Sequence, residues 1–140
     1  MRQFVSENFL PVKIHIKEQP KTFERFKAQW TPTQLILDSE GVERHRMEGF
    51  FPLEDFLAQL ELGLAKLSFQ KLQYREAEKH FRSLCQTYPA SGAAPEACYW
   101  AGVSAYKVTN KPEPLGEAAK LLKEKYPDSE WTRKASVWLH

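Results

Sequence analysis

The two cysteines carry the most reactive side chains of this sequence, and their spacing limits their chemistry. Cys85 and Cys98 form neither a C-x-x-C motif nor a zinc-binding spacing. Thiol–disulfide exchange needs a low-pKa thiolate at a helix N-terminus and a resolving thiol close to it, a context that neither cysteine has. We expect two reduced thiols within helices, and the alternative is a disulfide between neighbouring antiparallel helices.

The four histidines form no cluster with the spacing of metal ligands. They are His15, His45, His80 and His140. His15 and His45 lie on strand faces that carry other polar residues, so exposed imidazoles are expected. No nucleophile elbow, phosphate-binding loop or pair of carboxylates suited to acid–base catalysis is present. The sequence predicts no catalytic residue, no metal ligand and no cofactor-binding residue.

The first half of the chain alternates helical and strand patterns. A helix is expected at 2–9, an alternating strand at 12–17, a short helix ending near Gln29, and strands at 34–37 and 42–47 joined by a turn at Gly41. An amphipathic helix then begins at Pro52, with Glu54 and Asp55 near its N-terminus.

From about residue 62 the strand pattern disappears. Helices are expected at 62–72, 75–87, 95–109, 115–125 and 129–139, and prolines separate them. An internal repeat is visible here, because Tyr88-Pro89-Ala90-Ser91 recurs as Tyr126-Pro127-Asp128-Ser129. Leu84, Ala97 and Trp100 recur in the same register as Leu122, Ala135 and Trp138. This repeat predicts stacked helical hairpins.

Residues 1–67 resemble thioredoxin from its third strand onward. The resemblance rests on Trp30-Thr31-Pro32-Thr33, the Leu-Ile-Leu strand that follows, the hairpin with Gly41, and Gly49 before the last helix. It implies a cis peptide bond before Pro32 and a backbone next to this proline that pairs with extended peptides. Trp30, Thr31 and Pro32 are therefore the candidate peptide-binding residues. The alternative is a purely structural loop with Trp30 packed inward.

Residues 68–140 resemble tetratricopeptide repeats, in which Ala77, Phe81 and Pro89 match the motif spacing. Bacterial thioredoxin-like proteins with such a C-terminal array are the family that the whole chain resembles. The expected fold is thus α/β followed by all-α: an incomplete thioredoxin-like domain and then helical hairpins. The aromatic residues Tyr99, Trp100, Tyr106, Trp131 and Trp138 are interpreted as packing between hairpins rather than as a partner site.

The reactive C-x-x-C motif and one central strand of thioredoxins have no counterpart in this sequence. The resemblance therefore favours a non-catalytic protein that binds peptides or proteins through its repeats or the Pro32 loop. The alternative is the C-terminal portion of a thiol–disulfide oxidoreductase whose C-x-x-C lies upstream. Because the strands at 12–17 and 34–37 would lack a shared neighbour, a homodimer is also expected.

Composition excludes several other partners. The formal net charge is only +2, and basic residues alternate with acidic ones, so nucleic-acid binding is not expected. No stretch is long and apolar enough to span a membrane, and the N-terminus has no secretory signal pattern. We therefore expect a cytoplasmic protein that binds neither membrane nor cofactor.

Overall fold

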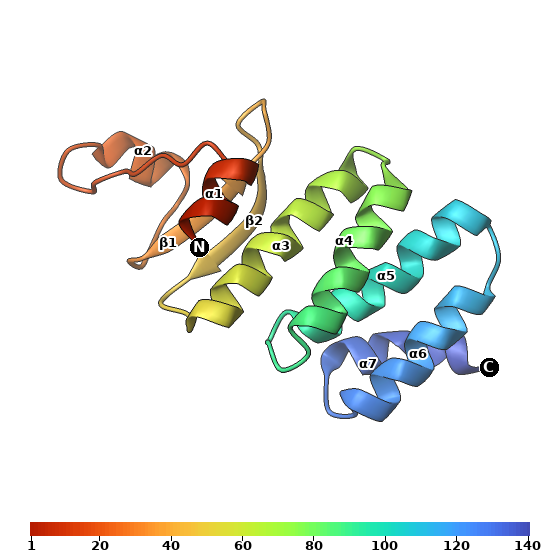
Figure 1. Cartoon of the computed structure of the whole chain (residues 1–140). Coiled ribbons are helices and arrows are strands. Elements are labelled where there is room, and N and C mark those ends of the chain that lie inside the picture. The colour runs from red at the N-terminus through yellow and green to blue at the C-terminus, as the bar shows by residue number, and fades with distance from the viewer. The chain divides into compact units, whose positions relative to one another are not determined.

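The computed structural model describes all 140 residues of the chain. Seven α-helices, two strands and one short 3-10 helix follow one another along it (Figure 1). The residues form two compact units. The first contains Met1–Gln34 and Met47–Phe50, and the second contains Leu35–Arg46 and Phe51–His140. The order of elements agrees with the expected α/β segment followed by an all-helical one.

The first unit contains the helices α1 (Arg2–Asn8) and α2 (Pro20–Arg25). The strand predicted at 12–17 is wrong: this stretch is irregular and ends in a turn before α2. Val12, Ile14 and Ile16 do alternate with polar residues in the sequence. A strand, however, also needs a neighbouring strand to complete its hydrogen bonds. The sheet of the structure has only two strands, and neither pairs with these residues.

The predicted hairpin is confirmed, with strands β1 (Thr33–Leu37) and β2 (Glu43–Glu48). Asp38 closes its turn, because its Oδ1 atom accepts hydrogen bonds of 2.9 Å from the N–H groups of Glu40 and Val42. Gly41 has the predicted positive φ, at 78°. An ion pair of 2.8 Å between Arg44 and Asp38 joins the turn to β2.

The helix α3 (Leu53–Gln70) begins as predicted but runs without a break through the region where a separate helix at 62–72 was expected. That part of the prediction is wrong because no proline interrupts the helix before Gln70, and the one glycine, Gly63, is accommodated within it. The boundary expected at residue 67 therefore lies within the last turn of α3. The following helices are α4 (Tyr74–Thr87), α5 (Ala94–Thr109), α6 (Glu113–Lys125), α7 (Glu130–Ala135) and the 3-10 helix η1 (Ser136–Leu139).

Each helix of the second unit packs on the next one, α3 on α4, α4 on α5 and α5 on α6 (Figure 1). The centre of this packing consists mainly of small side chains around Leu62, Phe81 and Leu84, which are at most 1% exposed. The alanines of the same cluster are Ala58, Ala65, Ala77, Ala93, Ala97 and Ala101. Because the alanine side chain is small, the helix axes can approach one another closely. Much of this core therefore consists of contacts between helix backbones and alanine methyl groups.

The internal repeat has the same geometry at its two occurrences. Tyr88 ends α4 and Tyr126 ends α6 with nearly the same backbone angles, φ −122° and ψ 56° against φ −134° and ψ 55°. In each case the tyrosine N–H donates to a leucine carbonyl, and a serine N–H donates back to the tyrosine carbonyl. The Tyr126 hydroxyl also donates to the carbonyl of Pro89 at 2.7 Å, so the second turn binds to the first.

Candidate functional site

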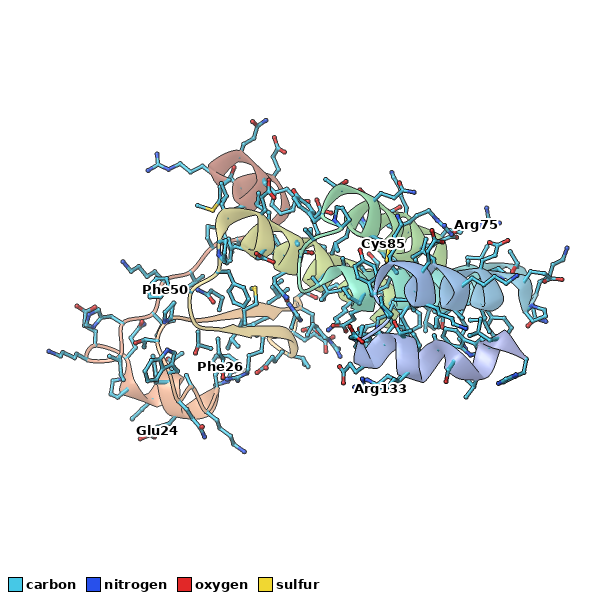
Figure 2. All side chains as sticks on the ribbon, turned by 90° about the horizontal axis from the view of Figure 1, so that it is seen from below. Glu24, Phe26, Phe50, Arg75, Cys85 and Arg133 are labelled. Carbon is cyan, nitrogen blue, oxygen red and sulfur yellow. A yellow bond between two sulfur atoms is a disulfide. The ribbon has the colours of Figure 1, made fainter.

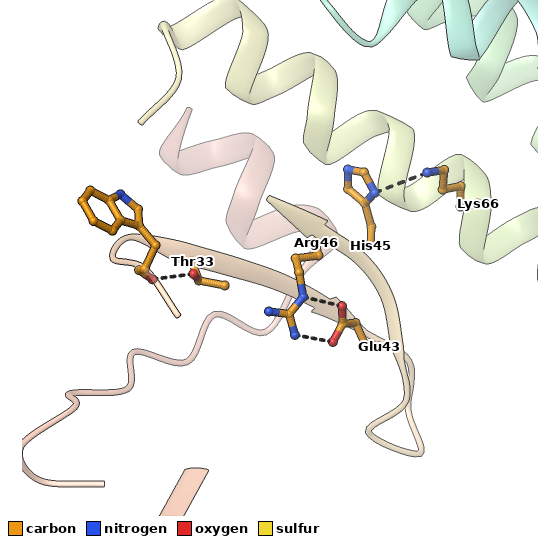
Figure 3. A network of polar contacts seen from close by, with 6 residues as sticks. Thr33, Glu43, His45, Arg46 and Lys66 are labelled. Carbon is orange, nitrogen blue, oxygen red and sulfur yellow. Dashed lines mark hydrogen bonds and ion pairs between the residues drawn. The ribbon is translucent and has the colours of Figure 1, made fainter. Parts of the chain in front are cut away.

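The Trp30–Thr33 loop is held in one conformation by two hydrogen bonds. The Thr33 hydroxyl donates to the Trp30 carbonyl at 2.6 Å (Figure 3). The Gly49 N–H donates to the Pro32 carbonyl at 2.8 Å. The Thr31–Pro32 peptide bond is cis. Both ends of the loop are therefore tied down, at Thr33 inside β1 and at Gly49 just after β2.

Between these fixed points, Thr31 has free backbone groups and Trp30 has a free side chain. Neither the N–H nor the C=O of Thr31 has a hydrogen-bond partner in the structure. The Trp30 side chain is 66% exposed, which rules out the inward-packed alternative. Pro32 itself is half-buried. The backbone of Thr31 thus offers one donor and one acceptor, and Trp30 offers a large apolar surface to solvent.

A shallow pocket of about 390 Å³ lies in the same unit. Its apolar lining comes from Ile16, Pro20, Phe23 and Ala28, and its polar lining from Glu24, Lys27 and Gln29. Gln29 directly precedes Trp30 in the chain. The lining of this pocket therefore reaches the residue that directly precedes the Trp30–Thr33 loop in the chain.

A polar cluster around His45 was not predicted from the sequence, and the expectation of an exposed His45 is wrong. The imidazole is half-buried, and its Nε2 lies 2.8 Å from Gln59 Oε1. Its Nδ1 lies 3.5 Å from Lys66 Nζ (Figure 3). Lys66 in turn forms an ion pair of 2.8 Å with Glu96. These residues join β2, α3 and α5.

The cause of this burial is the close approach of the hairpin to α3. A Cβ atom at Gly63 would clash with the side chain of Ile36 and would lie 3.3 Å from the Cβ of His45. Burial and the adjacent Lys66 ammonium hold the pKa of His45 below its usual value, against the opposing effects of Gln59 and Glu96. Gln59 Oε1 can only accept and the Lys66 ammonium can only donate, so this arrangement fits an imidazole with Nε2–H donating to Gln59 and Nδ1 accepting from Lys66.

The two cysteines form a disulfide between α4 and α5, so the expectation of two reduced thiols is wrong. Their Cα atoms lie 5.3 Å apart, because the antiparallel helices bring the end of α4 against the start of α5 (Figure 1). Figure 2 labels Cys85, which lies near the end of α4. Cys98 is only 3% exposed, inside the cluster formed with Ala119, Leu122 and Ala135. The disulfide is part of the helical core.

The aromatic residues of the repeats pack on one another, as the sequence predicted. The ring of Tyr99 stacks on Trp138 at 4.6 Å between centroids and contacts Trp131 at 5.1 Å and Trp100 at 5.5 Å. Tyr106 lies outside this group of ring contacts. The Lys134 ammonium covers Trp131 at 3.9 Å. These rings stabilise the packing of α5 with α7 and η1.

Two further observations concern metal ions and membranes. No group of three or more His, Cys, Asp and Glu side chains is arranged to hold a metal ion. None of the helices combines the length and the apolarity that crossing a bilayer requires.

Comparison with known proteins agrees with this geometry. Residues 1–64 match the family model of a thioredoxin-like domain, so the chain contains such a domain, which carries the Trp30–Thr33 loop. The matched residues end inside α3. No curated protein and no solved structure matches the chain.

Proposed function

We propose that this chain is a non-catalytic protein-interaction module whose Trp30–Thr33 loop binds an extended peptide. The observation that supports this most is the unpaired backbone of Thr31 beside an exposed Trp30. An extended peptide could donate to the Thr31 carbonyl and accept from its N–H, as in the addition of a strand to a sheet. Trp30 would supply the apolar contact that gives such pairing affinity.

The helices α3 to η1 would form the second part of this module, as degenerate tetratricopeptide-like hairpins. The matched turns at Tyr88 and Tyr126 support this reading, since both end a helix with the same hydrogen bonds. Arrays of this kind bind partners on extended surfaces. Because the aromatic rings of the repeats pack on one another, we infer that they stabilise the helical packing and do not themselves contact a partner.

The test is a selection of random peptides on the full chain, followed by calorimetric measurement of the selected sequences. Trp30→Ala should weaken binding about tenfold, the effect of removing a central aromatic contact of about 1.4 kcal/mol. Leu72→Ala is the matched control, because Leu72 is also exposed but lies in the helical unit. Equal affinities for the wild type and Trp30→Ala would contradict the proposal.

The thioredoxin-like domain also supports a second candidate function, thiol–disulfide exchange. In that case a C-x-x-C motif from a preceding segment would supply the reacting thiols. For the chain of 140 residues we expect no reduction of insulin disulfides above the uncatalysed rate with dithiothreitol. Turnover at the level of a thioredoxin would contradict this, and Cys85→Ala/Cys98→Ala would then tell whether the disulfide of the helical core takes part.

A further inference from the structure

The internal repeat relates the whole of α4 to α6, and it gives these two helices equivalent faces. Leu72 before α4 and Asn110 before α6 have the same sequence separation as the two Tyr-Pro turns, and both have a left-handed backbone, with φ of 61° and 55°. Leu84 in α4 and Leu122 in α6 also share this separation, and both are 0% exposed. The faces of α4 and α6 that point away from the core are therefore equivalent as well, and stacked repeats place such faces on one side of the array.

The outward faces of α4 and α6 carry opposite charges. Arg75 and Lys79 lie one turn apart on α4, and the repeat places Glu113 and Glu117 at the equivalent positions of α6. All four side chains are exposed, and none of them forms a hydrogen bond or an ion pair in the structure. We call Arg75 and Lys79 the basic face, and Glu113 and Glu117 the acidic face.

A second copy of the chain can pair both faces at once. α4 and α6 both pack on α5 and run antiparallel to it, so they are parallel to each other (Figure 1). A two-fold axis that runs between α4 and α6, parallel to them, places α4 of each copy opposite α6 of the other. Because equivalent positions then meet, Arg75 lies opposite Glu113 of the other copy and Lys79 lies opposite Glu117. The symmetry forms each of these two pairs twice.

The next turn of the same faces adds a repulsive pair, which limits the strength of the contact. Arg82 and Lys120 are equivalent in the repeat, so this arrangement places two cations opposite each other. Arg82 is already paired with Glu78 at 2.8 Å, which reduces the repulsion. Exposed ion pairs contribute little each, so we expect an association that forms at high protein concentration and is sensitive to salt.

We propose that two copies of this chain associate through the outward faces of α4 and α6, with the basic face of each copy on the acidic face of the other. The argument for a second copy is charge complementarity, since each copy carries both faces in the same spacing. This interface goes beyond the proposed function, because it uses no residue of the Trp30–Thr33 loop.

The first experiment is sedimentation velocity of the full chain over a range of protein concentrations, at low and at high salt. Every protein in it carries Phe50→Ser, because Phe50 is 91% exposed in the other unit and could cause a separate association. We expect a dimer that forms at low salt and dissociates as salt screens the charges. A chain that stays monomeric at low salt, or a dimer that salt does not weaken, would overturn the proposal.

An exchange of charges between the two faces locates the interface. Arg75→Glu/Lys79→Glu makes both faces acidic, and Glu113→Lys/Glu117→Lys makes both basic. Each of these double variants should dissociate at least about tenfold more readily than the parent, because all four pairs become repulsive. A mixture of the two should associate again, because every basic face then meets an acidic one. A mixture that associates no better than its components would overturn the proposal.

A matched control separates this interface from an effect of net charge. Lys17→Glu/Lys21→Glu gives the same net charge as Arg75→Glu/Lys79→Glu, at exposed positions outside the helical unit. It should associate like the parent, since both of its faces are intact. If this control lost as much association as Arg75→Glu/Lys79→Glu, net charge would be the cause and the proposal would be wrong.

Discussion

At the scale of single residues, surroundings decide the roles of side chains that look alike in the sequence. Trp30 and Trp138 have the same chemistry, but Trp30 is 66% exposed whereas Trp138 stacks on Tyr99. His15 and His45 both lie in stretches of alternating polarity, yet only His45 is drawn against a helix. The difference comes from Gly63, which lets the hairpin approach α3.

His45 predicts a pH dependence of stability. Its pKa is lower in the folded chain than the unfolded value of 6.5, so on acidification the unfolded chain takes up a proton before the folded one does. The free energy of unfolding should therefore fall as the pH drops below about 6.5 and stop falling below the folded-state pKa. His45→Gln should remove this part of the dependence in urea unfolding curves measured from pH 8 to pH 4.

His140→Gln is the control, since it removes an exposed imidazole at the end of the chain and leaves the His45 cluster intact. Burial raises the pKa of Glu61, which acts in the opposite direction and is common to all three proteins. The quantity to compare is therefore the difference between each variant and the wild type at each pH. If the difference in the free energy of unfolding between His45→Gln and the wild type did not vary with pH, the lowered pKa of His45 would be contradicted.

At the scale of elements, the turn between α3 and α4 contains an unfavourable residue. Leu72 has a φ of 61°, and the N–H of Gln73 donates to the Ser68 carbonyl, which is the hydrogen bonding of a helix end that usually has glycine at this position. The side chain is 70% exposed, so little packing offsets the steric cost.

Leu72→Gly should therefore stabilise the chain by about 1 kcal/mol, the cost of a left-handed conformation for a residue with a Cβ atom. Leu72→Ala keeps the Cβ and removes the rest of the side chain, so it should give no such gain. Thermal and urea unfolding of the three proteins measure the effect. If Leu72→Gly were no more stable than Leu72→Ala, the conformational argument would be wrong.

The disulfide predicts a second effect at this scale. Cys85 and Cys98 close a loop with a sequence separation of 13, and cross-links over loops of this size contribute about 3 kcal/mol. Cys85→Ala/Cys98→Ala should lower the free energy of unfolding by roughly 2–4 kcal/mol, and dithiothreitol should lower the wild type to a similar value.

Alkylation and mass spectrometry before and after reduction provide the direct check. The intact protein should incorporate no alkylating reagent, and the reduced protein should incorporate it at Cys85 and Cys98. Two alkylated cysteines without reduction would contradict the disulfide. A cytoplasmic location stays a prediction, and the disulfide is the observation that speaks against it, because cytosolic thiols are mostly kept reduced.

At the scale of the whole molecule, the first unit exposes several large apolar side chains. Leu10 and Phe50 are each 91% exposed, and Val12 and Trp30 are also open to solvent. The homodimer that the sequence suggested stays a prediction. Its contacts would involve side chains such as Phe50 rather than paired copies of residues 12–17, whose lysines repel one another.

Light scattering coupled to size-exclusion chromatography tests this prediction at micromolar concentration. We expect a dimer in the wild type and a larger monomer fraction in Phe50→Ser, since burial of a phenylalanine contributes about 1.5–3 kcal/mol. Val137→Ser is the control, because Val137 is 68% exposed but lies in the helical unit. A wild type that is monomeric throughout would contradict the prediction.

The sequence by itself determined the elements whose stability is local. The helices from α4 onward, the hairpin with Gly41 and the repeated Tyr-Pro turns follow from periodicity, prolines and turn residues, which act over a few positions. These signals also carried the resemblance that placed the Trp30–Thr33 loop in a thioredoxin-like domain.

Only the tertiary structure decided the features that depend on distant partners. The alternation at 12–17 formed no strand because no neighbouring strand is present to accept its hydrogen bonds. His45 became half-buried because α3 lies against the hairpin, and the cysteines met because α4 and α5 are antiparallel. Burial, pairing and cross-linking are properties of two segments at once, so no pattern within either segment contains them.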